Sequence, residues 1–143
     1  MIYIRFSQKC ITIERLDVRN FVAYDIKTIS LVENTEIKKS EAHIMVEIIE
    51  YVPNAVLSKT IVKKLTGNII VSSLDTGEGF SERISPFDTF IQVIDGKAEI
   101  VIDGESTILK TGDGIIVPAH HPNSMKANER FKMISTIIKS GYE

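Results

Sequence analysis

The sequence predicts an all-β domain folded as a sandwich or a closed barrel. A chain of 143 residues is long enough for one hydrophobic core and too short for two ordinary domains. Isoleucine occurs 24 times, valine 11 times and threonine 10 times, and these β-branched residues favour strands. Short apolar segments alternate with turn sequences in the C-terminal two thirds, and no long helical pattern separates them.

Turn residues divide the region after residue 55 into short strands. We predict strands over residues 56–64, 68–75, 81–85, 87–94, 97–102, 105–110, 115–118 and 131–138. Asp95-Gly96 and Asp103-Gly104 are predicted to close two successive hairpins, because Asp-Gly readily adopts the left-handed backbone angles of tight turns. Roughly eight strands therefore fit in this region.

The segment before these strands is predicted to contain a short amphipathic helix. Ile44, Ile48 and Tyr51 recur at helical spacing, which indicates a helix over residues 42–51 with Ser40 as its N-cap.

Apolar runs in the N-terminal forty residues are interpreted as extra strands that pair with the barrel edge or with another subunit. They lie at residues 2–4 and 21–24. We therefore divide the chain into an N-terminal extension over residues 1–44, which packs on or swaps with the barrel, and a barrel domain over residues 45–143.

Composition excludes several classes of partner. The net charge of −2 and the absence of a dense Lys/Arg run disfavour nucleic acid. No apolar stretch approaches the roughly 18 residues of a membrane span, and the N-terminus lacks a signal-peptide pattern, so we expect a cytoplasmic protein with no membrane partner. Cys10 is the single cysteine, which rules out an intramolecular disulfide and a metal site built on cysteine pairs.

Two segments resemble the paired motifs of the cupin superfamily. The first keeps the motif spacing through Gly77, Arg83, Ser85, Thr89 and Gly96. The second keeps it through Gly112, Pro118, His120 and Asn123. The resemblance covers about residues 45–140 and is closest to small, single-domain conserved barrels of the cupin-2 type. It implies a jelly-roll barrel, also called a double-stranded β-helix, of two antiparallel sheets, and a homodimer.

The residues at the metal-ligand positions differ from those of metal-binding cupins. There, the motifs supply three histidines and a glutamate, whereas this sequence has Arg83, Ser85, Thr89 and Asn123. A guanidinium repels a divalent cation, and hydroxyl and amide groups are poor ligands for transition metals. We therefore expect no metal cofactor, with a divalent transition metal as the less favoured alternative.

The histidines do not offer an obvious substitute metal site. His120 and His121 are adjacent, so on an extended segment they point to opposite faces, and His43 lies in the predicted helix. We favour ordinary polar contacts in a rim loop for His120 and His121. The alternative is that one of them, at the mouth of a pocket, donates to a ligand or moves a proton.

Arg83 is the first candidate for ligand binding, because the register implied by the resemblance places it on the barrel lining. Its planar guanidinium could hold a carboxylate or phosphate, while Ser85, Thr89 and Asn123 add neutral hydrogen bonds. The alternative is an internal salt bridge to a nearby carboxylate or a side chain that extends to the barrel mouth. The candidate partners for that salt bridge are Glu78, Glu82 and Asp88.

Strand alternation supplies the rest of the predicted lining. If Thr89 points inward, then Phe87, Ile91 and Val93 do as well. The opposite face then carries Asp88, Phe90, Gln92 and Ile94. An apolar outer face favours a homodimer, although residues 1–40 could instead cover it within one chain.

We therefore predict a metal-free small cupin that binds a small polar or anionic molecule, a sugar or a carboxylate, in its barrel. One alternative is a metal-independent isomerase or lyase in which Arg83 holds an anion and His120 or His121 moves a proton. Two further alternatives are a metalloenzyme with unconventional ligands and a structural or interaction module. An open cavity beside an unpaired Arg83 would favour ligand binding.

Overall fold

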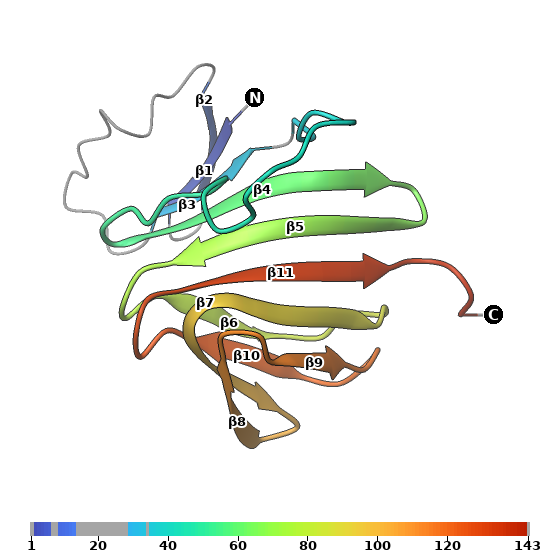
Figure 1. Cartoon of the computed structure of the whole chain (residues 1–143). Helices are drawn as coiled ribbons and strands as arrows, with labels where there is room; N and C mark the ends of the chain where they lie inside the picture. Colours follow the sequence, from blue (N-terminus) through green and yellow to red (C-terminus); the bar gives the residue numbers. More distant parts are fainter. Residues whose placement is uncertain (1, 7–8, 14–28, 34, 143) are drawn as a thin grey trace.

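The computed structural model describes residues 2–6, 9–13, 29–33 and 35–142, and this part of the chain is all-β (Figure 1). Its strands are β1 (Ile2–Phe6), β2 (Lys9–Ile13), β3 (Ile29–Glu33), β4 (Ala55–Lys64), β5 (Gly67–Leu74), β6 (Gly79–Arg83), β7 (Thr89–Ile102), β8 (Glu105–Lys110), β9 (Gly114–Val117), β10 (Asn123–Lys126) and β11 (Phe131–Ile138). Within these residues, no helix is long and apolar enough to cross a membrane.

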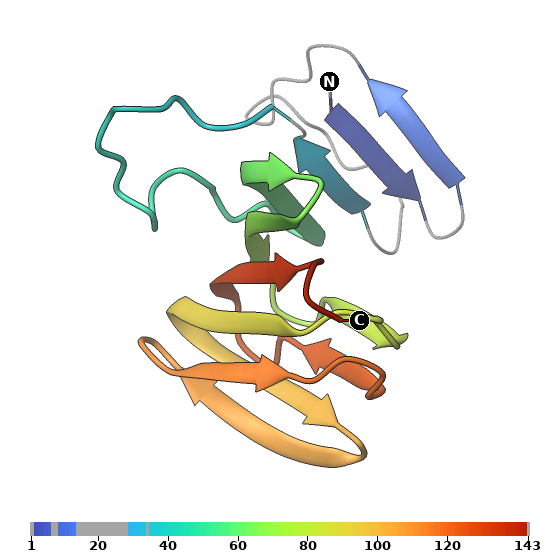
Figure 2. The same cartoon turned by 90° about the vertical axis from the view of Figure 1, so that its right-hand side faces the viewer.

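The predicted jelly-roll barrel is confirmed, and β7 connects its two sheets. The strand order is β2-β1-β3-β4-β5-β11-β7-β10-β6, and β8 and β9 also pair with β7. The first half of this 14-residue strand pairs with β9 and β11, and its second half pairs with β8 and β10. Because one strand serves both sheets, the strands curl around a common interior (Figure 2).

The predicted hairpin at Asp95-Gly96 is wrong, because β7 continues through these two residues without reversing direction. The pairing of β7 with β11 shifts by one residue at this point, which marks a β-bulge. Gly96 has a φ of 81°, and a Cβ there would stand 2.3 Å from the carbonyl oxygen of Arg130. Gly96 therefore lies where β7 passes close to the backbone of the segment that leads into β11. The Asp103-Gly104 hairpin is confirmed, with φ angles of 51° and 81° and a tight connection from β7 to β8.

The number of strands after residue 55 agrees with the prediction because two errors cancel. Two predicted strands are the halves of β7, and the four-residue β10 was not predicted. The sequence of β10, Asn-Ser-Met-Lys, is short and mostly polar, so it lacks the apolar pattern on which strand prediction depends. It is a strand because β6 and β7 pair with it on both sides.

The predicted helix over residues 42–51 is also wrong. The segment contains a turn in which the Glu47 amide donates to the Ile44 carbonyl, and the side chain of Ile44 is 61% exposed. Backbone carbonyls of this segment instead accept hydrogen bonds from side chains of the barrel. Ser73 Oγ donates to the Glu50 carbonyl at 2.7 Å, and Lys132 Nζ donates to the Val46 carbonyl at 2.5 Å. Ile49, at 6% exposure, packs inward from this segment. These tertiary contacts replace the hydrogen bonds within a helix.

The predicted extra strands at the N-terminus extend the sheet beyond β4. β3 pairs with β4 in parallel, and β1 then pairs with β3 and β2. Figure 2 shows these strands beside the edge of the barrel. The apolar run at residues 2–4 lies in β1, while the run at residues 21–24 lies outside the described residues. The boundary at residue 44 and an exchange of this extension between subunits stay predictions.

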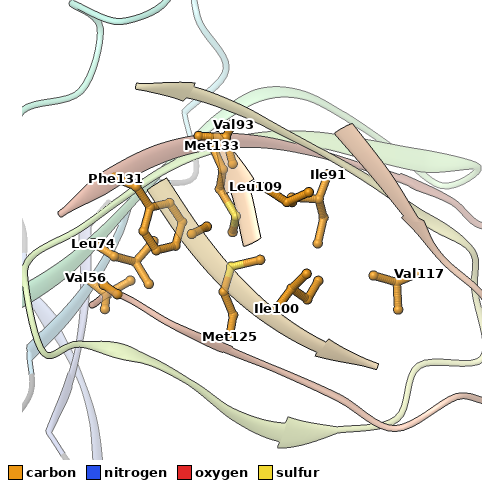
Figure 3. Packing of buried hydrophobic residues seen from close by; sticks show 12 residues of the cluster. Val56, Leu74, Ile91, Val93, Ile100, Leu109, Val117, Met125, Phe131 and Met133 are labelled. Atoms are coloured by element: carbon orange, nitrogen blue, oxygen red, sulfur yellow. The ribbon is translucent and has the colours of Figure 1, made fainter. Parts of the chain in front are cut away.

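The hydrophobic core lies between the two sheets. Its buried cluster comprises Val56, Leu74, Ile91, Val93, Ala98, Ile100, Leu109, Val117, Met125, Ala127, Phe131 and Met133. Figure 3 shows Val56 and Leu74 at one end of the cluster and Val117 at the other. Ile91, Val117 and Met133 also line a cavity, so the core and the candidate site share a wall.

Candidate functional site

A cavity of about 260 Å³ opens between the sheets next to the core. Its lining residues are Ser58, Ile70, Ser72, Phe80, Arg83, Ser85, Thr89, Ile91, Val117, Asn123, Met133, Ser135 and Ile137. They come from β4, β5, β6, β7, β9, β10 and β11 and from the loop after β6. Every strand of the barrel region except β8 therefore contributes to one concave site.

The structure brings together the four residues at the cupin ligand positions. Arg83, Ser85, Thr89 and Asn123 all line the cavity, although they come from separate parts of the chain. Ile91 joins them two residues after Thr89 on the inner face of β7. The alternation prediction therefore places these two side chains correctly.

Other predicted inward positions have different surroundings. Val93 is fully buried in the core, while Phe87 is outside the cavity lining and packs against the ring of Tyr142, with 5.8 Å between ring centroids. Phe87 precedes β7, so the two-residue alternation of the strand does not extend to it. Phe90, on the opposite face as predicted, is 44% exposed.

A β-bulge in β6 brings Phe80 and Arg83 to the same cavity. Arg83 pairs with Asn123 and Phe80 pairs with Met125. The two β6 residues are three positions apart and their β10 partners only two, so β6 has one extra residue. In a regular strand, residues three apart point to opposite faces, and the extra residue restores a common face. The Arg83 guanidinium carbon lies 4.9 Å from the centroid of the Phe80 ring, within reach of a cation–π interaction.

Arg83 forms no ion pair with any side chain in the described part of the chain. The salt bridges considered from the sequence are therefore not present there, and Asp88 Oδ1 instead accepts a hydrogen bond from the Ala119 amide at 2.7 Å. Arg83 is exposed as a whole residue, which places it where the cavity opens. Desolvation nevertheless lowers the pKa of its guanidinium from the usual value, because protein atoms replace part of its water shell.

Asn123 joins the edge of the cavity to the rim loop. Its side chain is buried, and Nδ2 donates to the carbonyl oxygens of Arg83 at 3.3 Å and His121 at 3.2 Å. Both amide hydrogens are thus used, and Oδ1 is the atom that can still accept a hydrogen bond. Asn123 therefore holds the backbone of Arg83 in place as well as lining the cavity.

Sequence reasoning did not identify the serines on the opposite wall. Ser58 and Ser72 face each other across β4 and β5 and share a hydrogen bond of 2.9 Å between their hydroxyl groups. Ser135 on β11 donates to the Ile70 carbonyl at 3.5 Å. A serine on the inward-facing positions of three apolar strands is a visible signal, but its meaning depends on a pairing register that the sequence did not specify.

The three histidines make polar contacts outside the cavity lining. His121 Nδ1 lies 2.5 Å from Asp103 Oδ2 and so links the rim loop to the β7–β8 turn. His120 is exposed, adopts a φ of 66°, and its amide donates to the Ser85 carbonyl at 2.7 Å. His43 contacts the Lys38 carbonyl through Nε2 at 2.8 Å. These contacts agree with the structural interpretation.

The side chains around the cavity do not fit a transition metal. Arg83 brings a fixed positive charge, and the oxygens of the serine and threonine side chains and of Asn123 are neutral. Within the described residues, no group of three or more His, Cys, Asp and Glu side chains could hold a metal ion.

A second hollow of about 670 Å³ lies near Tyr51, and its polar groups largely satisfy one another. The Tyr51 hydroxyl donates to Asp95 Oδ2 at 2.6 Å, and the Arg130 guanidinium lies 4.7 Å from the ring centroid. It is an open surface depression in which Asp75, Asp95 and Arg130 already have partners. The enclosed cavity at Arg83 is therefore the stronger candidate site.

Comparisons with known proteins agree with this fold. Residues 70–137 match the family model for the cupin domain, Cupin_2. With the jelly roll and its motif residues, this match places the chain in the cupin superfamily, as a conserved barrel of the cupin-2 type. A search of curated proteins finds no match.

Several solved structures resemble the chain. A conserved protein of unknown function from Streptococcus pyogenes is 29% identical with a TM-score of 0.71, and the match covers 75% of this chain and 94% of that one. A cupin superfamily protein from Desulfitobacterium hafniense is 26% identical with a TM-score of 0.70, covering 74% and 97%. A cupin 2 conserved barrel domain protein from Leptotrichia buccalis is 30% identical with a TM-score of 0.64, covering 66% and 46%.

Proposed function

We propose that this cupin binds a small polar or anionic molecule, a carboxylate or a sugar, in its barrel cavity without a metal ion. The observation that carries the proposal is Arg83, an arginine without an ion-pair partner among the described side chains at the opening of an otherwise uncharged cavity. Arg83 is exposed where the cavity opens, so its guanidinium can donate hydrogen bonds to the carboxylate of a ligand that enters the cavity.

The groups around Arg83 suit the recognition of an anion. A guanidinium presents a planar set of N–H donors that matches the two oxygens of a carboxylate. Thr89 and Ser85 carry hydroxyl groups on the same cavity wall, and these can donate further hydrogen bonds. The Phe80 ring below the guanidinium limits its movement, so less side-chain entropy is lost when a ligand binds.

Binding is better supported than acid–base catalysis. The isomerase or lyase alternative needs a proton-transfer group in the pocket, and neither His120 nor His121 is among the residues that line it. A purely structural role is less favoured because the barrel interior retains space instead of being filled with side chains. A small-molecule ligand explains both the space and the charge.

The test compares two variants that lose the same charge. Arg83→Gln should weaken binding of any small carboxylate or acidic sugar identified in a thermal-shift screen by about 2 kcal/mol, or roughly thirtyfold. Arg130→Gln removes a guanidinium outside the cavity and should leave affinity unchanged. Without ligand, Arg83→Gln should retain the stability of the parent protein, because it breaks no described ion pair.

Two outcomes would contradict the proposal. The first is a large loss of melting temperature in the Arg83→Gln protein with no change in ligand affinity, which would make Arg83 a structural residue. The second is a stoichiometric transition metal, found by elemental analysis of protein purified without a metal-affinity tag, whose removal abolishes ligand binding.

A further inference from the structure

Several side chains of the cavity wall already use part of their hydrogen-bonding capacity within the protein. Ser58 and Ser72 bond to each other, and Ser135 bonds to a backbone carbonyl. Ser85 Oγ accepts a hydrogen bond from the Phe87 amide at 3.2 Å, and both hydrogens of the Asn123 amide are donated to backbone carbonyls. Beside Arg83, the side-chain hydrogens left to donate are the hydroxyls of Ser85 and Thr89 and one hydroxyl of the Ser58–Ser72 pair, which is a small set for the many hydroxyl groups of a sugar.

The rest of the wall is apolar. The six apolar lining residues are Ile70, Phe80, Ile91, Val117, Met133 and Ile137. A hydroxyl group placed against these side chains would lose its hydrogen bonds to water without replacement, whereas a hydrocarbon group would gain from burial. The wall thus discriminates against a polyhydroxylated ligand and in favour of one with an apolar body.

Charge and volume restrict the ligand further. Arg83 is the single ionisable residue among the described residues that line the cavity, so a second negative charge in the interior would have no partner. Roughly nine molecules of liquid water occupy the same volume as this cavity of about 260 Å³. The ligand is therefore limited to on the order of ten non-hydrogen atoms.

We infer that the ligand is a monocarboxylic acid with a compact apolar body, rather than a sugar or a dianion. Its carboxylate lies against the Arg83 guanidinium at the opening, and its hydrocarbon part lies between the apolar side chains of the two sheets. This inference rests on the proposed function, since it specifies the occupant of the same cavity. It adds that selectivity comes from the wall opposite the charge as well as from Arg83.

Isothermal titration calorimetry of the full chain with matched probes tests the inference. Butyrate, pentanoate and hexanoate form one series, in which affinity should rise by about fourfold for each added methylene group. Benzoate should bind at least tenfold more tightly than benzamide, which has nearly the same shape without the charge. Glucuronate, a polyhydroxylated monoanion, and phthalate, a dianion of similar ring size, should each bind at least tenfold more weakly than benzoate.

Variants make the result specific to the cavity. Arg83→Gln should reduce hexanoate and benzoate affinity at least tenfold, and Arg130→Gln should not change it. If glucuronate or phthalate binds more tightly than benzoate and this binding needs Arg83, the inference is wrong but the proposed function stands. If none of these anions, nor any ligand from the thermal-shift screen, binds in a manner that depends on Arg83, both are wrong.

Discussion

Among the four residues at the cupin ligand positions, Arg83 is the one that carries a charge. In a cation-binding barrel the same position would hold a metal ligand, whereas here it holds a permanent positive charge. The hydrogen bond from Asn123 to the Arg83 backbone and the contact of the guanidinium with Phe80 position that charge. This positioned charge is the basis of our proposal that the cavity binds an anion.

Tyr51 provides a test of electrostatics away from the cavity. Desolvation, together with the hydrogen bond to Asp95, raises the pKa of the Tyr51 hydroxyl above its usual value near 10. A raised pKa means that the folded state holds this proton more tightly than the unfolded state does. The resulting stabilisation is present at neutral pH and is lost as the pH rises above about 10.

Tyr51→Phe should therefore lower the free energy of unfolding at pH 7 by about 0.5 to 1 kcal/mol, the contribution of one exposed hydrogen bond. It should also flatten the decline of stability above about pH 10. Urea unfolding followed by circular dichroism at each pH measures both effects. An unchanged alkaline decline in the variant would show that another group is responsible.

Among the structural elements, the bulge of β6 determines which of its side chains reach the cavity, and the bulge of β7 lies where that strand passes from one sheet to the other. Each inserts one residue and so reverses the face on which later residues lie. The bulge in β6 places Phe80 beneath Arg83, and the bend at Gly96 takes β7 from one sheet to the other. A strand without these irregularities would not connect the two walls of the same site.

Two glycines with the same backbone angle allow the importance of the β7 bend to be measured. Gly96 and Gly104 both have a φ of 81°, but a Cβ would meet the Arg130 carbonyl at 2.3 Å in the first case and no atom within 4 Å in the second. Gly104→Ala should cost about 1 kcal/mol of stability through backbone strain alone. Gly96→Ala should cost about 3 kcal/mol or more, because the backbone of the neighbouring segment must also move.

Thermal or urea unfolding of the two alanine variants provides the comparison. Equal losses of stability at the two positions would mean that the close approach at Gly96 is easily relieved. In that case the bend would depend only on the left-handed backbone conformation, and the packing of β11 against it would contribute little.

At the scale of the whole molecule, the outer face of the sheet carries two adjacent apolar residues that are exposed. Phe90 and Ile116 are register partners on β7 and β9, and their side chains are 44% and 63% exposed. Adjacent apolar residues at this exposure indicate a contact surface, and a homodimer is the partner that we expect. The N-terminal strands continue the sheet at β4, whereas Phe90 and Ile116 lie on strands that pair with neither β3 nor β4.

The Phe90→Ser/Ile116→Ser double variant should be monomeric under conditions in which the parent protein is a dimer. Ile108→Ser, which removes a 52% exposed side chain from β8, should remain dimeric. Size-exclusion chromatography with light scattering measures both masses. A monomeric parent protein, or a double variant that still dimerises, would contradict the expectation.

Sequence was most informative where the determining interactions are local. Asp103-Gly104 specifies a tight turn through two adjacent residues, and the inner positions Thr89 and Ile91 follow from strand alternation. The motif spacing placed Arg83 and Asn123 on one lining because it reflects a complete fold. The helix near residue 44 was predicted wrongly because its periodicity could not show that barrel side chains would bind its carbonyl groups.

The sequence by itself determined that this chain is an all-β barrel with one arginine and three neutral polar residues at the usual metal-ligand positions. Only the tertiary structure decided that Arg83 lies over Phe80, that the described residues provide it with no carboxylate partner, and that serines occupy the far wall. The physical reason is that turn angles and strand periodicity depend on neighbouring residues. Bulges, pairing registers and ion pairs instead depend on residues that only folding brings together.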